Sequence, residues 1–187
     1  MRRLAIPALL VVLTASPSAR GTEIEFTAES PEFAVATEEY RAIWKADGDR
    51  IANALHQETG LLLESGPIRA IVFEGVSSSG YHEDPMHLRA SYPADTKRAT
   101  LVHELSHRLV SDIVPGGADQ HAVIFLFVYD VWTILWGRQF ADAQVAIESE
   151  RRGIYDYEAA WRDALALGAD GRAKRWSELL SEWRRNP

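Results

Sequence analysis

Alternating apolar and polar positions predict β-strands in the first half of the chain. Between residues 22 and 27, Ile24 and Phe26 alternate with glutamates, which is typical of a strand with one buried face. Three further segments are expected to be extended, because they alternate, are rich in β-branched residues or carry a proline at a strand edge. They are residues 31–36, 68–73 and 86–92.

Helical spacing of apolar residues dominates the rest of the chain. A first helix is expected from residue 37 to about residue 59, where Gly60 ends it. A second helix follows Pro93, with Asp95 as its N-cap, and stops at the Pro-Gly-Gly sequence of residues 115–117. Further helices are expected at about 120–137, 140–152, 157–167 and 171–184.

The expected fold class is α+β. A helix-rich domain would carry a small N-terminal β-sheet packed on the second helix, followed by a helical C-terminal half. A chain of 187 residues supports one domain, here residues 20–187, with the sheet and second helix in 20–113 and the helical part in 114–187. The apolar segment 122–136 is too short to span a membrane and contains Asp130, so it is expected to be a core helix.

The first 19 residues have the pattern of a secretory signal peptide. Arg2 and Arg3 precede an apolar run over residues 4–13 and then a stretch of small residues over 14–19. The sequence therefore predicts an exported protein, periplasmic or secreted, with no stable membrane insertion after cleavage. An uncleaved anchor is the alternative.

Composition limits the partners and the metal chemistry. The net charge is −7, and removal of the signal segment leaves 18 basic against 27 acidic residues, a charge of −9. This charge argues against nucleic acid as a partner. The chain has no cysteine, so a bound transition metal would be held by histidine and carboxylate.

Candidate chemistry centres on His103-Glu104-Leu105-Ser106-His107, an H-E-x-x-H sequence in the second expected helix. Residues four apart lie on one helix face, so two imidazoles can share one metal ion. Zn²⁺ suits neutral imidazole ligands. Glu104 would act as the general base that takes a proton from the attacking water.

This motif and the order of elements resemble the zincin metallopeptidases, with a gluzincin-like arrangement, over about residues 33–137. The resemblance implies that the strand at 86–92 is the sheet edge and pairs with an extended peptide or protein substrate. A metzincin continues the motif with glycine and a third histidine. Val110 and Ile113 occupy those positions here, which excludes that branch.

Catalytic zinc usually has three protein ligands, and three downstream residues are candidates for the third. His121 follows His107 by 14 residues and is favoured, because imidazole suits zinc. Asp130 follows His107 by 23 residues, which resembles the gluzincin spacing, and is either the alternative ligand or a partner of a ligand histidine. On one continuous helix these two residues would lie ~13 Å apart, so both cannot bind one ion. Asp119 is a further alternative ligand, a partner of a ligand histidine, or an ordinary N-cap.

The resemblance also implies a side chain that stabilises the oxyanion, for which Tyr155 and Tyr157 are candidates. The predicted function is an exported zinc metallopeptidase. Two alternatives remain: a zincin-like binding or scaffold protein without hydrolytic activity, and an envelope hydrolase of a non-peptide bond. The intact Glu104 argues against the scaffold protein.

Overall fold

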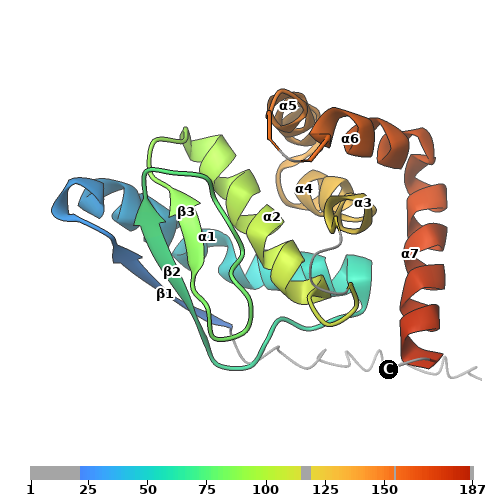
Figure 1. Cartoon of the computed structure of the whole chain (residues 1–187), viewed down its shortest axis with the longest axis horizontal. Coiled ribbons are helices and arrows are strands. Elements are labelled where there is room, and N and C mark those ends of the chain that lie inside the picture. Colours follow the sequence, from blue (N-terminus) through green and yellow to red (C-terminus); the bar gives the residue numbers. More distant parts are fainter. Residues whose placement is uncertain (1–21, 115–118, 154, 186–187) are drawn as a thin grey trace, which may run out of the picture.

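The computed structural model describes residues 22–114, 119–153 and 155–185. The predicted signal peptide and the Pro-Gly-Gly sequence at 115–117 lie outside these residues. The described chain is α+β, as the sequence predicted, with a small sheet on one side and helices on the other (Figure 1). Among the described helices, none has the length and apolar content needed to cross a membrane.

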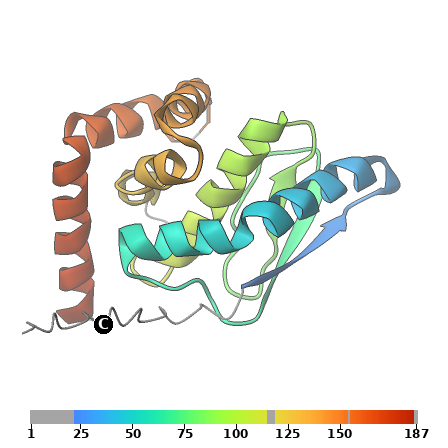
Figure 2. The same cartoon turned by 180° about the vertical axis from the view of Figure 1, so that it is seen from behind.

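The sheet contains three parallel strands in the order β1-β2-β3. They are β1 (Glu23–Ala28), β2 (Pro67–Phe73) and β3 (Met86–Arg89), close to three of the predicted strands. Every second residue is buried, as alternation requires for a sheet covered on one face. Helix α1 (Ala34–Thr59) covers that face and crosses in front of the strands in Figure 2.

The predicted strand at 31–36 is wrong. Pro31–Phe33 form a short 3-10 helix that leads directly into α1. Proline is favoured in a first helical turn because it has no N–H to leave unpaired, so Pro31 begins a helix here and does not mark a strand edge. At the other end α1 stops as predicted, because Gly60 adopts φ +69° and its N–H donates to the His56 carbonyl at 2.8 Å.

Helix α2 (Ala94–Val110) carries the H-E-x-x-H sequence and lies between the sheet and the C-terminal helices (Figure 1). Pro93, and not Asp95, is its N-cap. Asp95 lies in the first turn, where its carboxylate favours the positive helix end and pairs with Arg98 at 2.7 Å. Every residue from Ala99 to Ser106 is buried, because α2 is covered from two sides.

The predicted helix at 120–137 is interrupted. It forms α3 (His121–Ile124) and α4 (Val128–Trp136), separated by a turn at 125–127. Both phenylalanines of the turn are buried: Phe125 stacks on Trp161 with ring centroids 3.7 Å apart, and Phe127 meets Trp176 edge-on at 5.2 Å. These two contacts with different helices outweigh the helical propensity of the segment.

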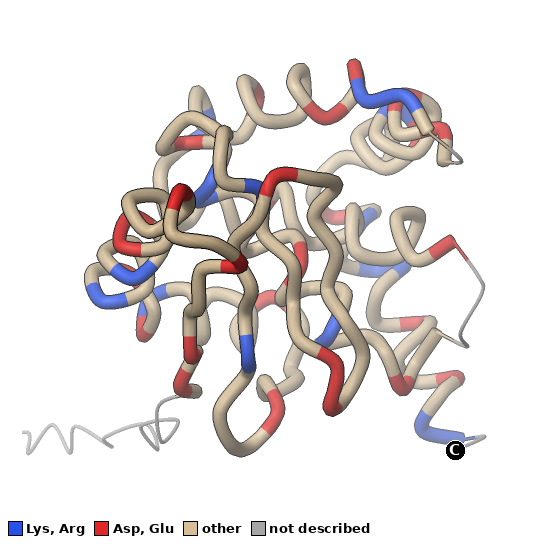
Figure 3. The backbone as a smooth tube through the Cα atoms, turned by 60° about the vertical axis from the view of Figure 1, so that its left-hand side comes forward, with Lys and Arg blue, Asp and Glu red and all other residues tan. Residues whose placement is uncertain are grey.

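Three further helices complete the C-terminal half near their predicted positions. They are α5 (Arg138–Ser149), α6 (Tyr157–Ala166) and α7 (Gly168–Arg185). Acidic and basic residues are interspersed along the described chain (Figure 3).

Candidate metal centre

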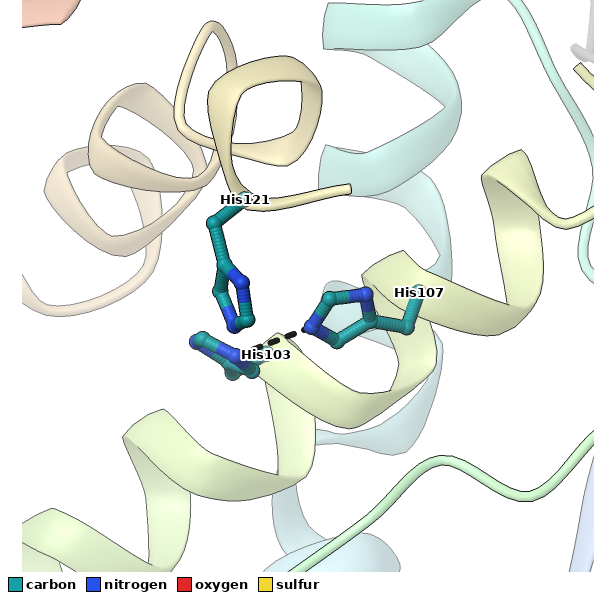
Figure 4. A group of neighbouring side chains, drawn as sticks. All are labelled: His103, His107 and His121. Atoms are coloured by element: carbon teal, nitrogen blue, oxygen red, sulfur yellow. Dashed lines mark hydrogen bonds between the residues drawn. The ribbon is translucent and has the colours of Figure 1, made fainter. Parts of the chain in front are cut away.

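Three histidine side chains converge where α2 meets the start of α3 (Figure 4). His103 and His107 lie one helical turn apart on α2, and His121, the first residue of α3, approaches from the opposite side. The Nε2 atoms of His103 and His107 are 3.1 Å apart, and one nitrogen from each ring lies within 4.8 Å of the others. His103 is 1% exposed and His121 is 4% exposed. These three residues are close enough to hold one metal ion.

Each of the three imidazoles has an oxygen acceptor at its Nδ1 atom. The pairs are His103 with Glu148 Oε1 at 2.9 Å, His107 with Gln120 Oε1 at 2.8 Å, and His121 with Asp119 Oδ1 at 2.7 Å. The first pair is an ionic contact whose alignment falls short of a hydrogen bond. Acceptors in these positions favour a proton on Nδ1, which leaves Nε2 unprotonated on each ring.

This protonation pattern fits a cation. The 3.1 Å between the two Nε2 atoms suits a hydrogen bond when one of them carries the proton (Figure 4), whereas two unprotonated Nε2 atoms at this distance repel each other unless a positive ion lies close to both. Burial, and then the neighbouring His103 and His121, lower the pKa of His107 to about 3. Burial and His103 also lower the pKa of His121. His107 and His121 are therefore neutral at pH 7, which is the form of imidazole that binds metal.

Glu148 is a buried partner of this centre that the sequence analysis missed. It lies on α5, is 1% exposed, and its Oε2 accepts a hydrogen bond from Trp161 Nε1 at 3.0 Å. Burial alone would raise its pKa, but the charge and contact of His103, followed by Arg151, lower the pKa to about 2. A signal was present in the sequence, because Glu148 falls at helical spacing from the buried positions Ala141 and Gln144.

Glu104 lies next to His103 on α2 and is 4% exposed. Burial is the main influence on this carboxyl and raises its pKa to about 7, although His103 and Arg151 oppose the shift. Glu104 forms no hydrogen bond or ion pair with another described side chain. A buried carboxyl group without a partner is costly and is typical of functional sites.

A cavity of about 660 Å³ opens onto the metal centre. Its floor is the face of α2 with His103, Glu104 and His107, together with Gln120 and His121. The rest of the lining comes from residues 76–79, Arg89 and Tyr92, and from residues 151–153, Tyr155 and Tyr157. This volume suits a small ligand or a few residues of a peptide.

Both candidate tyrosines lie beside His121 in this cavity. The ring centroids of Tyr155 and Tyr157 are 4.8 and 4.5 Å from that of His121. Tyr155 is 38% exposed, whereas Tyr157 is half-buried. Burial raises the pKa of Tyr157 to about 12, and Glu148 and Glu104 add to the shift while Arg151 opposes it. Its hydroxyl therefore remains protonated at pH 7 and can donate a hydrogen bond.

Asp130 is not part of the histidine group. Both of its carboxylate oxygens accept hydrogen bonds from Arg172 on α7, at 2.7 to 3.0 Å. The aspartate does have the partner that its apolar surroundings require, but that partner is an arginine and not a ligand histidine. Asp119 lies behind His121. Its Oδ1 accepts hydrogen bonds from the backbone N–H of His121 and from the Nδ1 atom of the same residue. Asp119 is thus a partner of a candidate ligand and not the N-cap of α3, which is Gln120.

Strand β3 is the sheet edge, as expected from the zincin resemblance, but it does not offer free backbone groups at 87–89. The N–H and carbonyl of His87 pair with Ser78, and the N–H of Arg89 donates to Ser77 Oγ at 3.1 Å. The Arg89 carbonyl accepts from Tyr40 at 3.0 Å. The prediction that substrate pairs with this part of the strand is therefore wrong, because the chain's own loop and α1 already satisfy the edge.

Comparisons of the chain with protein-family models, with curated proteins and with solved structures found no match.

Proposed function

We propose that this protein is a zinc-dependent metallopeptidase. The observation that carries the proposal is the convergence of three imidazoles, each with an oxygen acceptor at its Nδ1 atom, beside a buried glutamate. Three protein nitrogens suit Zn²⁺ and leave its fourth position open, which is the arrangement of catalytic zinc sites. Structural zinc sites usually have four protein ligands, and no fourth ligand belongs to the described group.

His103, His107 and His121 would hold the ion through Nε2. Bound zinc supplies a water of lowered pKa and polarises the carbonyl group under attack. The residues behind the rings fix the orientation of each imidazole, so the site is organised before the ion arrives.

Glu104 would transfer the proton from the attacking water to the leaving amine. Its pKa of about 7 allows the carboxylate to accept a proton from water and then deliver it to the leaving amine at neutral pH. Because no other described side chain pairs with Glu104, its oxygens remain available for this transfer. A protein that only stored or displayed a metal would have no use for such a group, whose burial costs free energy.

Tyr157, or the more exposed Tyr155, would donate a hydrogen bond to the carbonyl oxygen as negative charge develops on it. Tyr157 suits this role because its raised pKa keeps the phenolic proton in place. Its position against His121 puts the hydroxyl-bearing ring beside the proposed zinc site.

The test combines metal content with turnover of a mixed peptide library by the purified protein. Glu104→Gln should keep one zinc per chain and lose about 10²- to 10⁴-fold in turnover, because only the proton acceptor is removed. His121→Ala should lose both zinc and turnover. Asp130→Asn is the matched control and should keep zinc, because Asp130 pairs with Arg172 away from the site.

Full zinc content in His121→Ala would refute the ligand assignment. Cleavage that persists unchanged in excess chelator would refute the metal mechanism. A zinc-loaded protein that cleaves no peptide would refute the assignment of peptides as substrates.

A further inference from the structure

Arg151 occupies a half-buried position in the wall of the cavity. It follows α5 directly, and its backbone N–H donates to the Glu148 carbonyl at 2.9 Å. Its guanidinium carbon lies 5.9 Å from the ring centroid of Tyr92 and 5.7 Å from that of Tyr157. Two aromatic faces and an anchored backbone therefore hold the side chain in place before any ligand binds.

The hydrogen-bond donors of this guanidinium are largely unused. Its Nη1 is ion-paired with Glu148 Oε1 at 3.4 Å, and the guanidinium also interacts with the Tyr157 side chain, which opposes the rise that burial causes in the pKa of that hydroxyl. Glu148 is already engaged by His103 and Trp161. Arginine carries five N–H donors in a planar fork that matches a carboxylate, so Arg151 has donors left for an anionic group beside its contacts with Glu148 and Tyr157.

Arg151 lies close to the proposed site of bond cleavage. Glu148 Oε1 is 3.4 Å from Arg151 Nη1 and 2.9 Å from His103 Nδ1, so one carboxylate oxygen separates the guanidinium from a candidate zinc ligand. An extended peptide advances ~3.3–3.6 Å per residue. Arg151 and the three histidines also line one cavity, so a carboxylate on a peptide residue next to the scissile bond would enter the same cavity as Arg151.

The charge of the cavity wall also favours an anionic ligand. Its charged residues in the described chain are Arg89, Arg151 and Arg152 against Glu104, although the whole protein has a net charge of −7. Arg89 is already paired, since its Nε donates to Glu74 at 2.6 Å. Arg152 is exposed and directs Nη1 at backbone carbonyl groups. Arg151 is thus the arginine of this wall best placed to receive a ligand.

We propose that Arg151 binds a carboxylate of the substrate, so that the protein prefers peptides with a negative charge on the residue after the scissile bond. That charge is either the free C-terminal carboxylate or an acidic side chain. This inference rests on the proposed peptidase function, because it assigns the substrate class of the same site.

The experiment measures binding by calorimetry on zinc-loaded Glu104→Gln protein, which should not consume the ligand. The probes are N-acetyl-alanyl-alanine, its C-terminal amide, and N-acetyl-alanyl-glutamic acid amide. At least one charged probe should bind about 10- to 100-fold more tightly than the uncharged amide, which is the range for charge-assisted hydrogen bonds. A preference for the first probe identifies a C-terminal carboxylate, and a preference for the third identifies an acidic side chain.

Adding Arg151→Gln to this protein should abolish the preference, whereas the matched Arg152→Gln should retain it. Arg151→Lys should keep part of the preference, because it preserves the charge but loses the bidentate fork. This lysine variant also tests the idea if the glutamine variant does not fold.

Equal binding of all three probes, or an unchanged preference after Arg151→Gln and Arg151→Lys, would overturn the inference. Wild-type protein that cleaves peptides with no charge preference would overturn the subsite and leave the peptidase proposal standing. A preference that depends on Arg151, in a protein that hydrolyses no peptide, would support the subsite and refute the peptidase.

Discussion

Replacement of Glu148 by glutamine should weaken zinc binding without removing a zinc ligand. The carboxylate contacts His103 Nδ1 through one oxygen at 2.9 Å and accepts from Trp161 through the other at 3.0 Å. Glutamine has nearly the same shape but only one acceptor oxygen and no charge. Either His103 or Trp161 must then lose its acceptor in a site that water does not reach, since Glu148 is 1% exposed.

The size of the effect follows from what the lost contact does. A carboxylate behind a ligand histidine fixes the ring and increases its basicity, and loss of such a partner typically lowers metal affinity about 10- to 100-fold. This range corresponds to about 1.4 to 2.8 kcal/mol. We expect the upper part of the range, because Arg151 loses its nearby counter-charge at the same time and leaves an uncompensated positive charge in the cavity of the proposed zinc site.

The assay is a competition titration of zinc against a chromophoric chelator, with thermal unfolding of the metal-free proteins measured alongside. Glu150→Gln is the matched control, because Glu150 is exposed and lies only two residues further along the chain. If Glu148→Gln bound zinc within twofold of wild type while its metal-free form unfolded more readily, Glu148 would be a structural residue and our reasoning would be wrong.

Two further predictions concern stability. Asp130→Asn leaves the buried Arg172, whose side chain is 4% exposed, without its carboxylate partner, so it should lower the free energy of unfolding by about 3 kcal/mol in chemical denaturation. The exposed Asp163→Asn is the control, and an equal loss there would contradict this reasoning. Glu58 has a pKa raised above 4.5, chiefly by burial and then by Asp130, so its ionisation destabilises the folded state as pH rises. Glu58→Gln should therefore raise Tm at pH 7 and change it little below about pH 4, and the opposite order would contradict the assigned direction of the shift.

Sequence reasoning was strongest where local spacing decides the outcome. The alternation around Ile24 and Phe26 predicted β1. Gly60 marked the end of α1, because only glycine adopts the left-handed backbone conformation at little cost in free energy. The positions of His103 and His107 on one face of α2 follow from helical periodicity alone.

Sequence reasoning failed where distant residues decide the backbone. The turn at 125–127 depends on Trp161 and Trp176, which come from other helices and leave no mark on local periodicity. The same turn breaks the continuous helix on which the comparison of His121 and Asp130 depended. Asp130 then pairs with Arg172, 42 residues along the chain.

The sequence by itself determined that this is an α+β chain in which two imidazoles share a helix face with a glutamate. Only the tertiary structure decided that His121 joins them, that Glu148 lies behind His103, and that Arg151 faces the same cavity. The physical reason is the distance along the chain over which each effect acts. Periodicity and capping act within a few residues, whereas the outer partners of a metal centre are brought together by helix packing that is decided across the whole core.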